Sequence, residues 1–134
     1  MKKTFLVALL VAGMAASASA QSISEASAKY DAKEYKASGE VYEKAFAKGK
    51  GSTTDYYNAA CSWALAGNKN KAMAYLQQAV EQGYSNLSHL KQDADLNSLH
   101  GDKRWKALVQ ELEKKVAAIE AKYNQPLKAQ LEKI

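Results

Sequence analysis

One cysteine and two histidines are the side chains of this sequence that are best suited to catalysis or metal binding. Cys61 lies in an apolar stretch, where a buried, unreactive thiol is far commoner than an activated one. His89 and His100 do not belong to a glutamate-flanked zinc helix, and the sequence has no serine elbow or glycine-rich phosphate loop. We therefore expect no enzyme activity, no metal site and no cofactor.

The segment Asp93-Ala94-Asp95-Leu96-Asn97 imitates the opening of a calcium-binding loop. Such a loop needs glycine at its sixth position and glutamate at its twelfth, and Ser98 and Arg104 stand at those positions instead. Short polar side chains of this kind also cap helices and form turns. We therefore interpret Asp93, Asp95 and Asn97 as residues that cap helices and form turns.

Helical spacing runs through most of the sequence. Apolar residues at i, i+3, i+4, i+7 and i+8 predict a helix from Asn70 to Gln82, and a similar pattern predicts one from Thr54 to Ala66, capped by Thr53 or Thr54. Gly67 and the residue after it leave room only for a tight connection. Because short loops make neighbouring helices antiparallel, these two segments should form a helical hairpin.

The residues before this hairpin repeat its pattern after 34 residues, an interval typical of helical repeat proteins. Small residues and bulky residues coincide between the two copies, as expected where helices cross closely. The coinciding pairs are Ser38 with Ala72, Tyr42 with Leu76, Ala45 with Ala79, Phe46 with Val80, and Gly49 with Gly83.

Residues 55–115 carry a likeness to a known family. The matching positions are Tyr57-Asn58-Ala59-Ala60-Cys61, Trp63, Ala64-Leu65-Ala66-Gly67, Ala72 to Gly83, Leu87 to Leu90, Asp95-Leu96, Leu99, and Trp105 to Leu112. In this order they resemble the tetratricopeptide (TPR) repeat family, in the exported bacterial variant that ends a repeat group. The resemblance implies an α-solenoid of antiparallel helical hairpins.

The resemblance also implies a function, because this family mostly mediates association between proteins. The first helix of each repeat would line a concave face that accepts a protein or peptide segment. The residues that map to this face are Thr54, Tyr57, Asn58, Cys61, Ala64 and Leu65. The expected role is that of a non-catalytic scaffold or adaptor.

A long helix should begin after Asp102, a good N-cap, and carry one apolar face. The residues of that face are Trp105, Leu108, Val109, Leu112, Val116, Ile119 and Tyr123. Asn124-Gln125 then suggests a break, and Pro126 suits the first turn of a further helix with Leu127, Leu131 and Ile134 on one face. This short helix should fold back, meet a partner chain or, as we prefer, continue into sequence beyond Ile134.

The chain begins like a secretory signal peptide, with Lys2-Lys3, an apolar run and small residues up to Ala20. We expect cleavage after Ala20 and a periplasmic or secreted protein without a membrane span. Of 19 basic residues, two lie in this leader, so 17 remain against 14 acidic ones. This mild excess, with lysines and glutamates interleaved, argues against a nucleic-acid partner.

These patterns together predict an all-α protein in four parts. Residues 1–20 are the signal peptide, 21–84 two helical hairpins, 85–123 short helical turns and a long capping helix, and 124–134 the start of a further helix. Two alternatives to the scaffold role stay open. The chain could be the N-terminal accessory region of a longer exported enzyme or assembly protein, or it could self-associate through its last helices.

Overall fold

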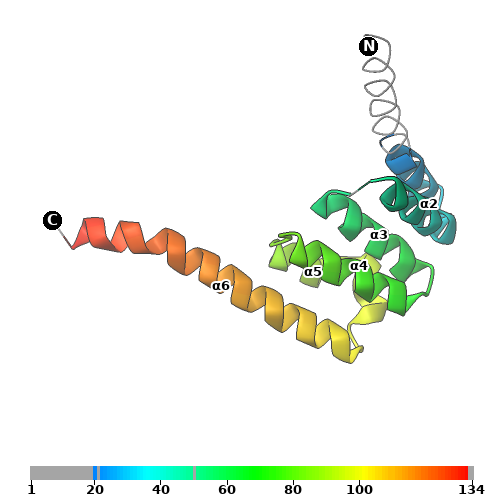
Figure 1. The fold of residues 1–134 in the computed structure, drawn as a ribbon. Coiled ribbons are helices and arrows are strands. Elements are labelled where there is room, and N and C mark those ends of the chain that lie inside the picture. The colour runs from blue at the N-terminus through cyan, green and yellow to red at the C-terminus, as the bar shows by residue number, and fades with distance from the viewer. Residues whose placement is uncertain (1–19, 21, 50, 133–134) are drawn as a thin grey trace, which may run out of the picture.

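The computed structural model describes residue 20, residues 22–49 and residues 51–132, with the side chains of 126–128 outside that description. Within this part of the chain every regular element is a helix and there is no strand, so the predicted all-α fold is confirmed. Helical hairpins form one end of the molecule, and a long helix projects from them (Figure 1). The predicted signal peptide lies outside the described residues except for Ala20.

The first hairpin pairs a helix over residues 22–31 with α2, Tyr35–Lys48. The turn between them places Lys33 at a φ of 61°, in the left-handed region. Ser38 is fully buried where the helices meet, and its hydroxyl donates to the carbonyl oxygen of Ala26 at 2.7 Å. The small residue predicted here thus lets the helices approach closely, and its hydroxyl is satisfied by hydrogen bonding.

The second hairpin consists of α3, Thr53–Leu65, and α4, Lys69–Glu81, one residue earlier than predicted at each end. The N-cap of α3 is Ser52 rather than Thr53 or Thr54. Ser52 and Asp55 form a capping box in which each side chain accepts a hydrogen bond from the other residue's backbone N–H. Gly67 lies between the C-cap of α3, Ala66, and the N-cap of α4, Asn68, and its φ of 83° favours glycine.

Trp63 links the two hairpins and is 3% exposed. It lies against the backbone of Gly39 on α2, where an added Cβ atom would come within 2.5 Å of the indole ring. The ammonium group of Lys71 lies 4.1 Å from the centroid of the same ring. Trp63 therefore lies in the packed centre between the two hairpins.

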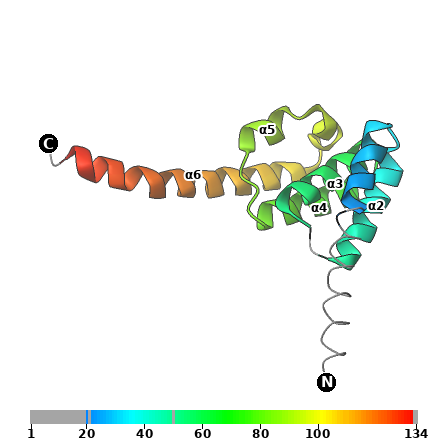
Figure 2. The ribbon, with the colours of Figure 1, turned by 90° about the horizontal axis from the view of Figure 1, so that it is seen from above.

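A short helix, α5 (Leu87–Gln92), and a 3₁₀ helix, η1 (Ala94–Leu99), return the chain across α3. Their buried residues Leu90, Leu96 and Leu99 are fully excluded from solvent. Figure 2 shows these elements beside the near end of the long helix. They pack against α3 and the long helix, and they place polar residues of the 85–95 segment over α3.

The last element, α6, runs without interruption from Lys103 to Leu131. Asp102 precedes it, and its carboxylate accepts from the backbone N–H of Arg104 at 2.9 Å, so the predicted N-cap is confirmed. The predicted break at Asn124-Gln125 and the separate helix starting at Pro126 are wrong. Proline in a helix interior costs about 3 kcal/mol, because it cannot donate to the carbonyl four residues earlier. Here that carbonyl belongs to Lys122, which is exposed to water, and the residues before the proline are good helix formers, so α6 continues.

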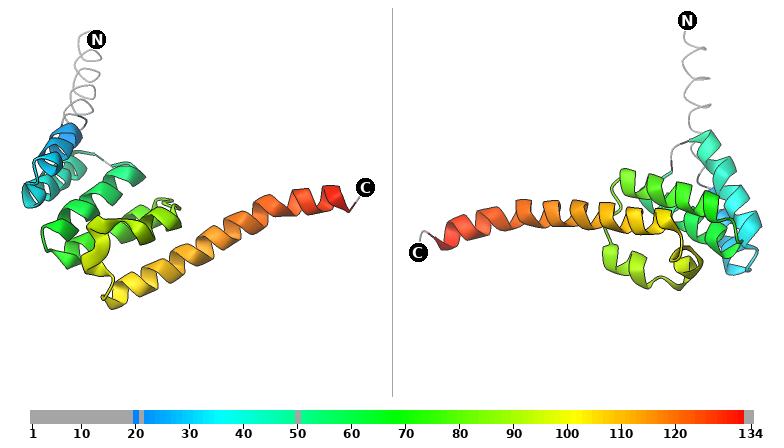
Figure 3. Two further views of the ribbon diagram at one scale, coloured as in Figure 1. Left: turned by 180° about the vertical axis from the view of Figure 1, so that it is seen from behind. Right: turned by 90° about the horizontal axis from the view of Figure 1, so that it is seen from below.

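The predicted apolar face of α6 is covered only over its first half. Trp105, Leu108 and Leu112 are buried where α6 packs on α4 and α5, whereas Ile119 is 46% and Tyr123 74% exposed. The far half projects away from the remaining elements in both views of Figure 3. Among the described residues, no helix is long and apolar enough to cross a membrane.

Candidate functional site

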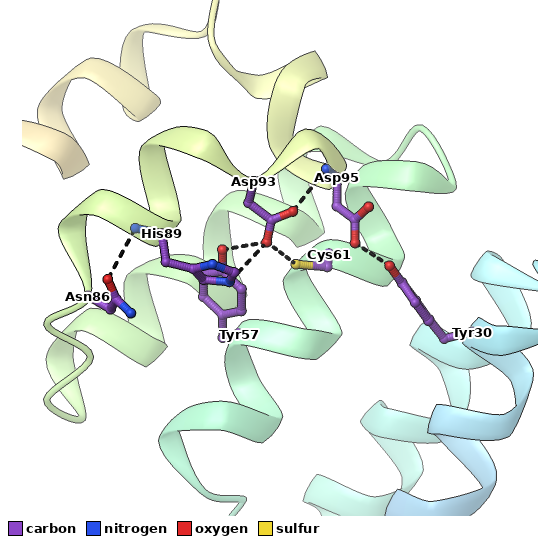
Figure 4. Close-up of polar contacts among 7 residues, drawn as sticks. All are labelled: Tyr30, Tyr57, Cys61, Asn86, His89, Asp93 and Asp95. Carbon is purple, nitrogen blue, oxygen red and sulfur yellow. Dashed lines mark hydrogen bonds and ion pairs between the residues drawn. The ribbon is translucent and has the colours of Figure 1, made fainter.

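A cavity of about 640 Å³ opens between the first hairpin, α3 and the α5–η1 segment. Its walls combine aromatic rings with short polar and acidic side chains. The lining residues are Ser27, Tyr30, Asp31, Tyr42, Thr54, Tyr57, Asn58, Cys61, Tyr84, Asn86, His89, Asp93 and Asp95. Polar groups from distant parts of the chain converge here (Figure 4).

Asp93 is the centre of this polar network. It ends α5 and caps η1, where its carboxylate accepts from the backbone N–H of Asp95 at 3.0 Å. The same carboxylate accepts from the hydroxyl of Tyr57 at 2.7 Å and lies 3.4 Å from Nε2 of His89. The side chain of Asp93 is only 15% exposed, so these partners replace water around the charge.

Asp95 connects the α5–η1 segment to the first hairpin. Its carboxylate accepts a hydrogen bond from the hydroxyl of Tyr30, which comes from the helix over residues 22–31 (Figure 4). This bond and the burial of the hydroxyl raise the pKa of Tyr30 well above its ordinary value. Tyr30 therefore remains a proton donor to the carboxylate throughout the neutral range.

Cys61 projects from α3 toward Asp93, and its Sγ atom lies 3.8 Å from the carboxylate. Burial raises the pKa of the thiol strongly, and the negative charges of Asp93 and Asp95 raise it further. The base that a catalytic thiol needs is not in contact with it, because His89 lies against Asp93 instead. The prediction that Cys61 is buried is confirmed.

Tyr57 and Tyr84 form one wall of the cavity, with ring centroids 4.6 Å apart and planes inclined by 13°. Burial is the main cause that raises the pKa of both hydroxyls, and Asp93 adds to the effect in each. The neighbouring Tyr57 hydroxyl lowers the pKa of Tyr84, although the two do not meet the geometry of a hydrogen bond. The buried hydroxyl of Tyr84 has no hydrogen-bonding partner in the described structure.

Cys61, Asp93 and Asp95 also have the proximity that a metal site requires. One ligand atom from each lies within 4.8 Å of the others. Both carboxylates already accept hydrogen bonds from tyrosines, and the thiol is held protonated. A metal ion would have to displace a proton from the thiol and compete with these donors.

Four of the six residues predicted to line a concave binding face do line this cavity: Thr54, Tyr57, Asn58 and Cys61. The other two do not. Ala64 is 4% exposed within the hydrophobic core, and Leu65 lies at the end of α3 outside the cavity. The lining residues of α3 end at Cys61, so these two positions in the last turn of the helix lie beyond the cavity.

Sequence reasoning did not place Tyr30, His89, Asp93 and Asp95 in the site. Asp93 is a capping residue as predicted, because it is the N-cap of η1. The prediction that Asp95 is a cap is wrong, because Asp95 lies within η1 and its carboxylate accepts from Tyr30 instead. The i, i+4 spacing of His89 and Asp93 was a signal that could have indicated their contact. The contact of Tyr30 with Asp95 joins residues 65 positions apart, and no local pattern indicates it.

Comparison with known families gives one result. The model of the family described as A/B hydrolase-like, N-terminal domain matches residues 19–120, which is more than half of the chain. No curated protein and no solved structure is significantly similar to the chain. The match spans both hairpins, the α5–η1 segment and the docked half of α6.

The predicted membership of the tetratricopeptide family is wrong, because the matching family is the A/B hydrolase-like N-terminal domain. The features that suggested it are general requirements of helix packing. Small residues such as Ser38 and Ala72 are needed wherever two helices cross closely, and glycine suits any tight exit from a helix. A class agreement at a 34-residue interval does not distinguish one family of helical hairpins from another.

Proposed function

Because the chain belongs to the family of A/B hydrolase-like N-terminal domains, we propose that it acts as a non-catalytic accessory domain of an A/B hydrolase-like protein. The observation that carries this proposal is the extent of the match, which covers residues 19–120. The alternative interpretation of the sequence, an accessory region of a larger enzyme, is therefore preferred to the free-standing adaptor.

The chemistry of the cavity supports a role in binding rather than catalysis. A nucleophile of the cysteine type needs a lowered pKa and a base in contact with it. Cys61 has a raised pKa, and its polar neighbour is the carboxylate of Asp93 rather than an imidazole. The accessory domain then supplies surfaces and contacts, and the A/B hydrolase-like region supplies the reacting groups.

The projecting half of α6 is the surface best suited to contact that region. Ile119 and Tyr123 continue the apolar face that docks α6 on the hairpins, and Leu131 extends it. Exposed apolar side chains that continue a buried face are typical of an interface. We propose that this stripe packs against the A/B hydrolase-like region.

The place of action is part of the proposal. The first 20 residues have the order of a signal peptide, with two lysines, an apolar run and small residues before Gln21. We propose that the domain works in the periplasm or outside the cell. N-terminal sequencing of the protein recovered from the periplasm checks this, and a product that retains Met1 would contradict it.

The accessory role is tested by interaction with the A/B hydrolase-like region of its own protein or operon. Light scattering and calorimetry should detect a complex between this region and the chain, and Ile119→Glu should abolish it. Ala121→Glu is the matched control, since it adds the same charge to the opposite side of α6. Failure to find such a region in the genome, or equal binding by both variants, contradicts the proposal.

A further inference from the structure

The cavity has walls suited to a flat, cationic group. Tyr30, Tyr42, Tyr57 and Tyr84 are among the lining residues and supply aromatic surface, with Tyr57 and Tyr84 stacked on each other. The negative face of an aromatic ring attracts cations within about 6 Å, and guanidinium groups also stack on such rings. The ring surfaces therefore favour an arginine-like head group over an anion.

The charged side chains of the cavity are all of one sign. Asp31, Asp93 and Asp95 line it, and no lysine or arginine is among its described lining residues. The carboxylates of Asp93 and Asp95 come within 4.8 Å of each other at the inner end, next to Cys61. Their present partners there are neutral hydroxyl, thiol and amide donors and His89, whose Nε2 lies 3.4 Å from Asp93.

Two like charges in a partly buried site repel each other, and a cation between or beside them relieves that repulsion. The negative potential already acts on neighbouring groups, because Asp93 contributes to the raised pKa values of Cys61, Tyr57 and Tyr84. A guanidinium group can satisfy several carboxylate oxygens at once, since it carries five N–H donors in a plane.

The unpartnered hydroxyl of Tyr84 is an independent indication of a ligand. Its oxygen is buried and makes no hydrogen bond in the described structure, and Tyr84 is one of the residues that line the cavity. Buried hydroxyl groups nearly always have a partner from the protein, from water or from a ligand. A donor N–H group entering the cavity beside Tyr57 would supply one.

We propose that this cavity binds a guanidinium group, with Asp93 and Asp95 as the anionic partners and the tyrosines as stacking walls. The group comes either from an arginine side chain of a protein segment or from a small guanidino compound. This inference goes beyond the accessory role and does not depend on it, because the site lies on the hairpins rather than on the projecting half of α6.

The test adds three probes to the intact chain. Their binding is measured by calorimetry and by shifts of the tyrosine ring resonances in NMR spectra. N-acetyl-arginine methylamide represents a peptide side chain, agmatine represents a small guanidino compound, and N-acetyl-citrulline methylamide is the uncharged control. We expect the first two to bind saturably and the citrulline derivative to bind at least about tenfold more weakly. Tighter binding of the first assigns a protein segment, and tighter binding of agmatine a small compound.

Asp93→Asn and Asp95→Asn each remove one charge while keeping the shape and a hydrogen-bond acceptor. Each should weaken binding of the arginine derivative about tenfold, the loss expected for one charge-assisted hydrogen bond. Glu81→Gln is the matched control, because Glu81 is exposed on α4 and does not line the cavity. Circular dichroism establishes that each variant is folded, and if one is not, the other carries the comparison.

Three results would overturn the inference. They are equal binding of the arginine and citrulline derivatives, no shift of the tyrosine resonances with any probe, and displacement of the arginine derivative by stoichiometric Zn²⁺ or Ca²⁺, which would assign a metal site instead. Ile119→Glu should bind the arginine derivative as the unmodified chain does. Loss of the α6 interaction and loss of guanidinium binding are thus separable outcomes.

Discussion

The thiol of Cys61 lies between the hydrophobic core around α3 and the carboxylates of Asp93 and Asp95. Burial and the two negative charges both oppose its ionisation. We expect iodoacetamide to alkylate it at pH 8 at least about tenfold more slowly than in the chain unfolded in urea, because only the thiolate reacts. Mass spectrometry after timed quenching measures the two rates. Equal rates would mean that the thiol is accessible and not perturbed.

Gly39 shows how a single missing side chain determines a helix crossing. Alanine normally stabilises a helix interior relative to glycine by about 0.5 to 1 kcal/mol. At Gly39 the added Cβ atom would meet three ring atoms of Trp63 at 2.5 to 2.8 Å, and a buried indole ring cannot yield easily. The cost of overpacking should exceed the gain in helix propensity, so Gly39→Ala should lower the free energy of unfolding by about 1 to 3 kcal/mol.

Gly101→Ala provides the control for that measurement. An added Cβ atom at Gly101 meets nothing within 4 Å, so its effect on urea unfolding should stay within about 0.5 kcal/mol. If Gly39→Ala proved as stable as the unmodified chain, the close contact between α2 and Trp63 would be incorrect.

At the scale of elements, periodicity and turn residues predicted the hairpin of α3 and α4 to within one residue. The starting point of α3 was placed wrongly because Ser52 completes a capping box with Asp55, and a reciprocal pair stabilises an end more than a single threonine does. The course of α6 was also predicted wrongly. Pro126 was given more weight than the helix formers Glu120, Ala121 and Lys122 that precede it.

The two halves of α6 should differ in stability. Up to Val116 the helix is held by buried leucines and by polar contacts such as the salt bridge of Lys91 with Glu113 at 2.7 Å. From Ile119 onward it has no described tertiary cover, and isolated helical segments of this length are marginal in water. Amide hydrogens of residues 119–125 should therefore exchange at least about tenfold faster than those of 108–112.

Hydrogen exchange with mass spectrometry or NMR measures that difference on the monomeric chain. Addition of the A/B hydrolase-like region should slow exchange over residues 119–125, since the proposed interface would then be covered. Uniform protection along α6 in a demonstrated monomer would show that the far half is stable by itself and would remove the main argument for an interface there.

For the whole molecule, local patterns predicted the helices but not the cavity that they enclose. Tyr57 and Cys61 were placed on the correct face of α3, because helical spacing determines which side of a helix they share. Asp95 and Tyr30 meet only after the α5–η1 segment has crossed α3 and reached the first hairpin. Such contacts depend on the angles between elements, which single-chain periodicity does not encode.

The buried tyrosine hydroxyls make the stability of the whole domain depend on pH in the alkaline range. Tyr30, Tyr57 and Tyr75 are tyrosines whose pKa is raised on folding, and burial with the contact to Glu43 raises the pKa of Tyr75 to about 12. The ordinary value is 10.0, so above it the unfolded chain loses these protons while the folded chain retains them. Their contribution to stability is complete below pH 10 and falls as the pH rises toward 12.

We therefore expect the urea midpoint of unfolding to decrease steadily from about pH 10 to about pH 12. Absorbance at 295 nm, which reports tyrosinate, should rise together with the loss of helical circular dichroism, because these hydroxyls ionise only when the carboxylates and the core no longer enclose them. The chain in concentrated urea is the reference, with tyrosines that titrate near their ordinary value. Tyr57→Phe should make the decrease in the midpoint smaller, since the chain then lacks one of the hydroxyl protons that the folded state retains above pH 10. A midpoint independent of pH over this range would contradict the burial of these hydroxyls and their bonding to Asp93 and Asp95.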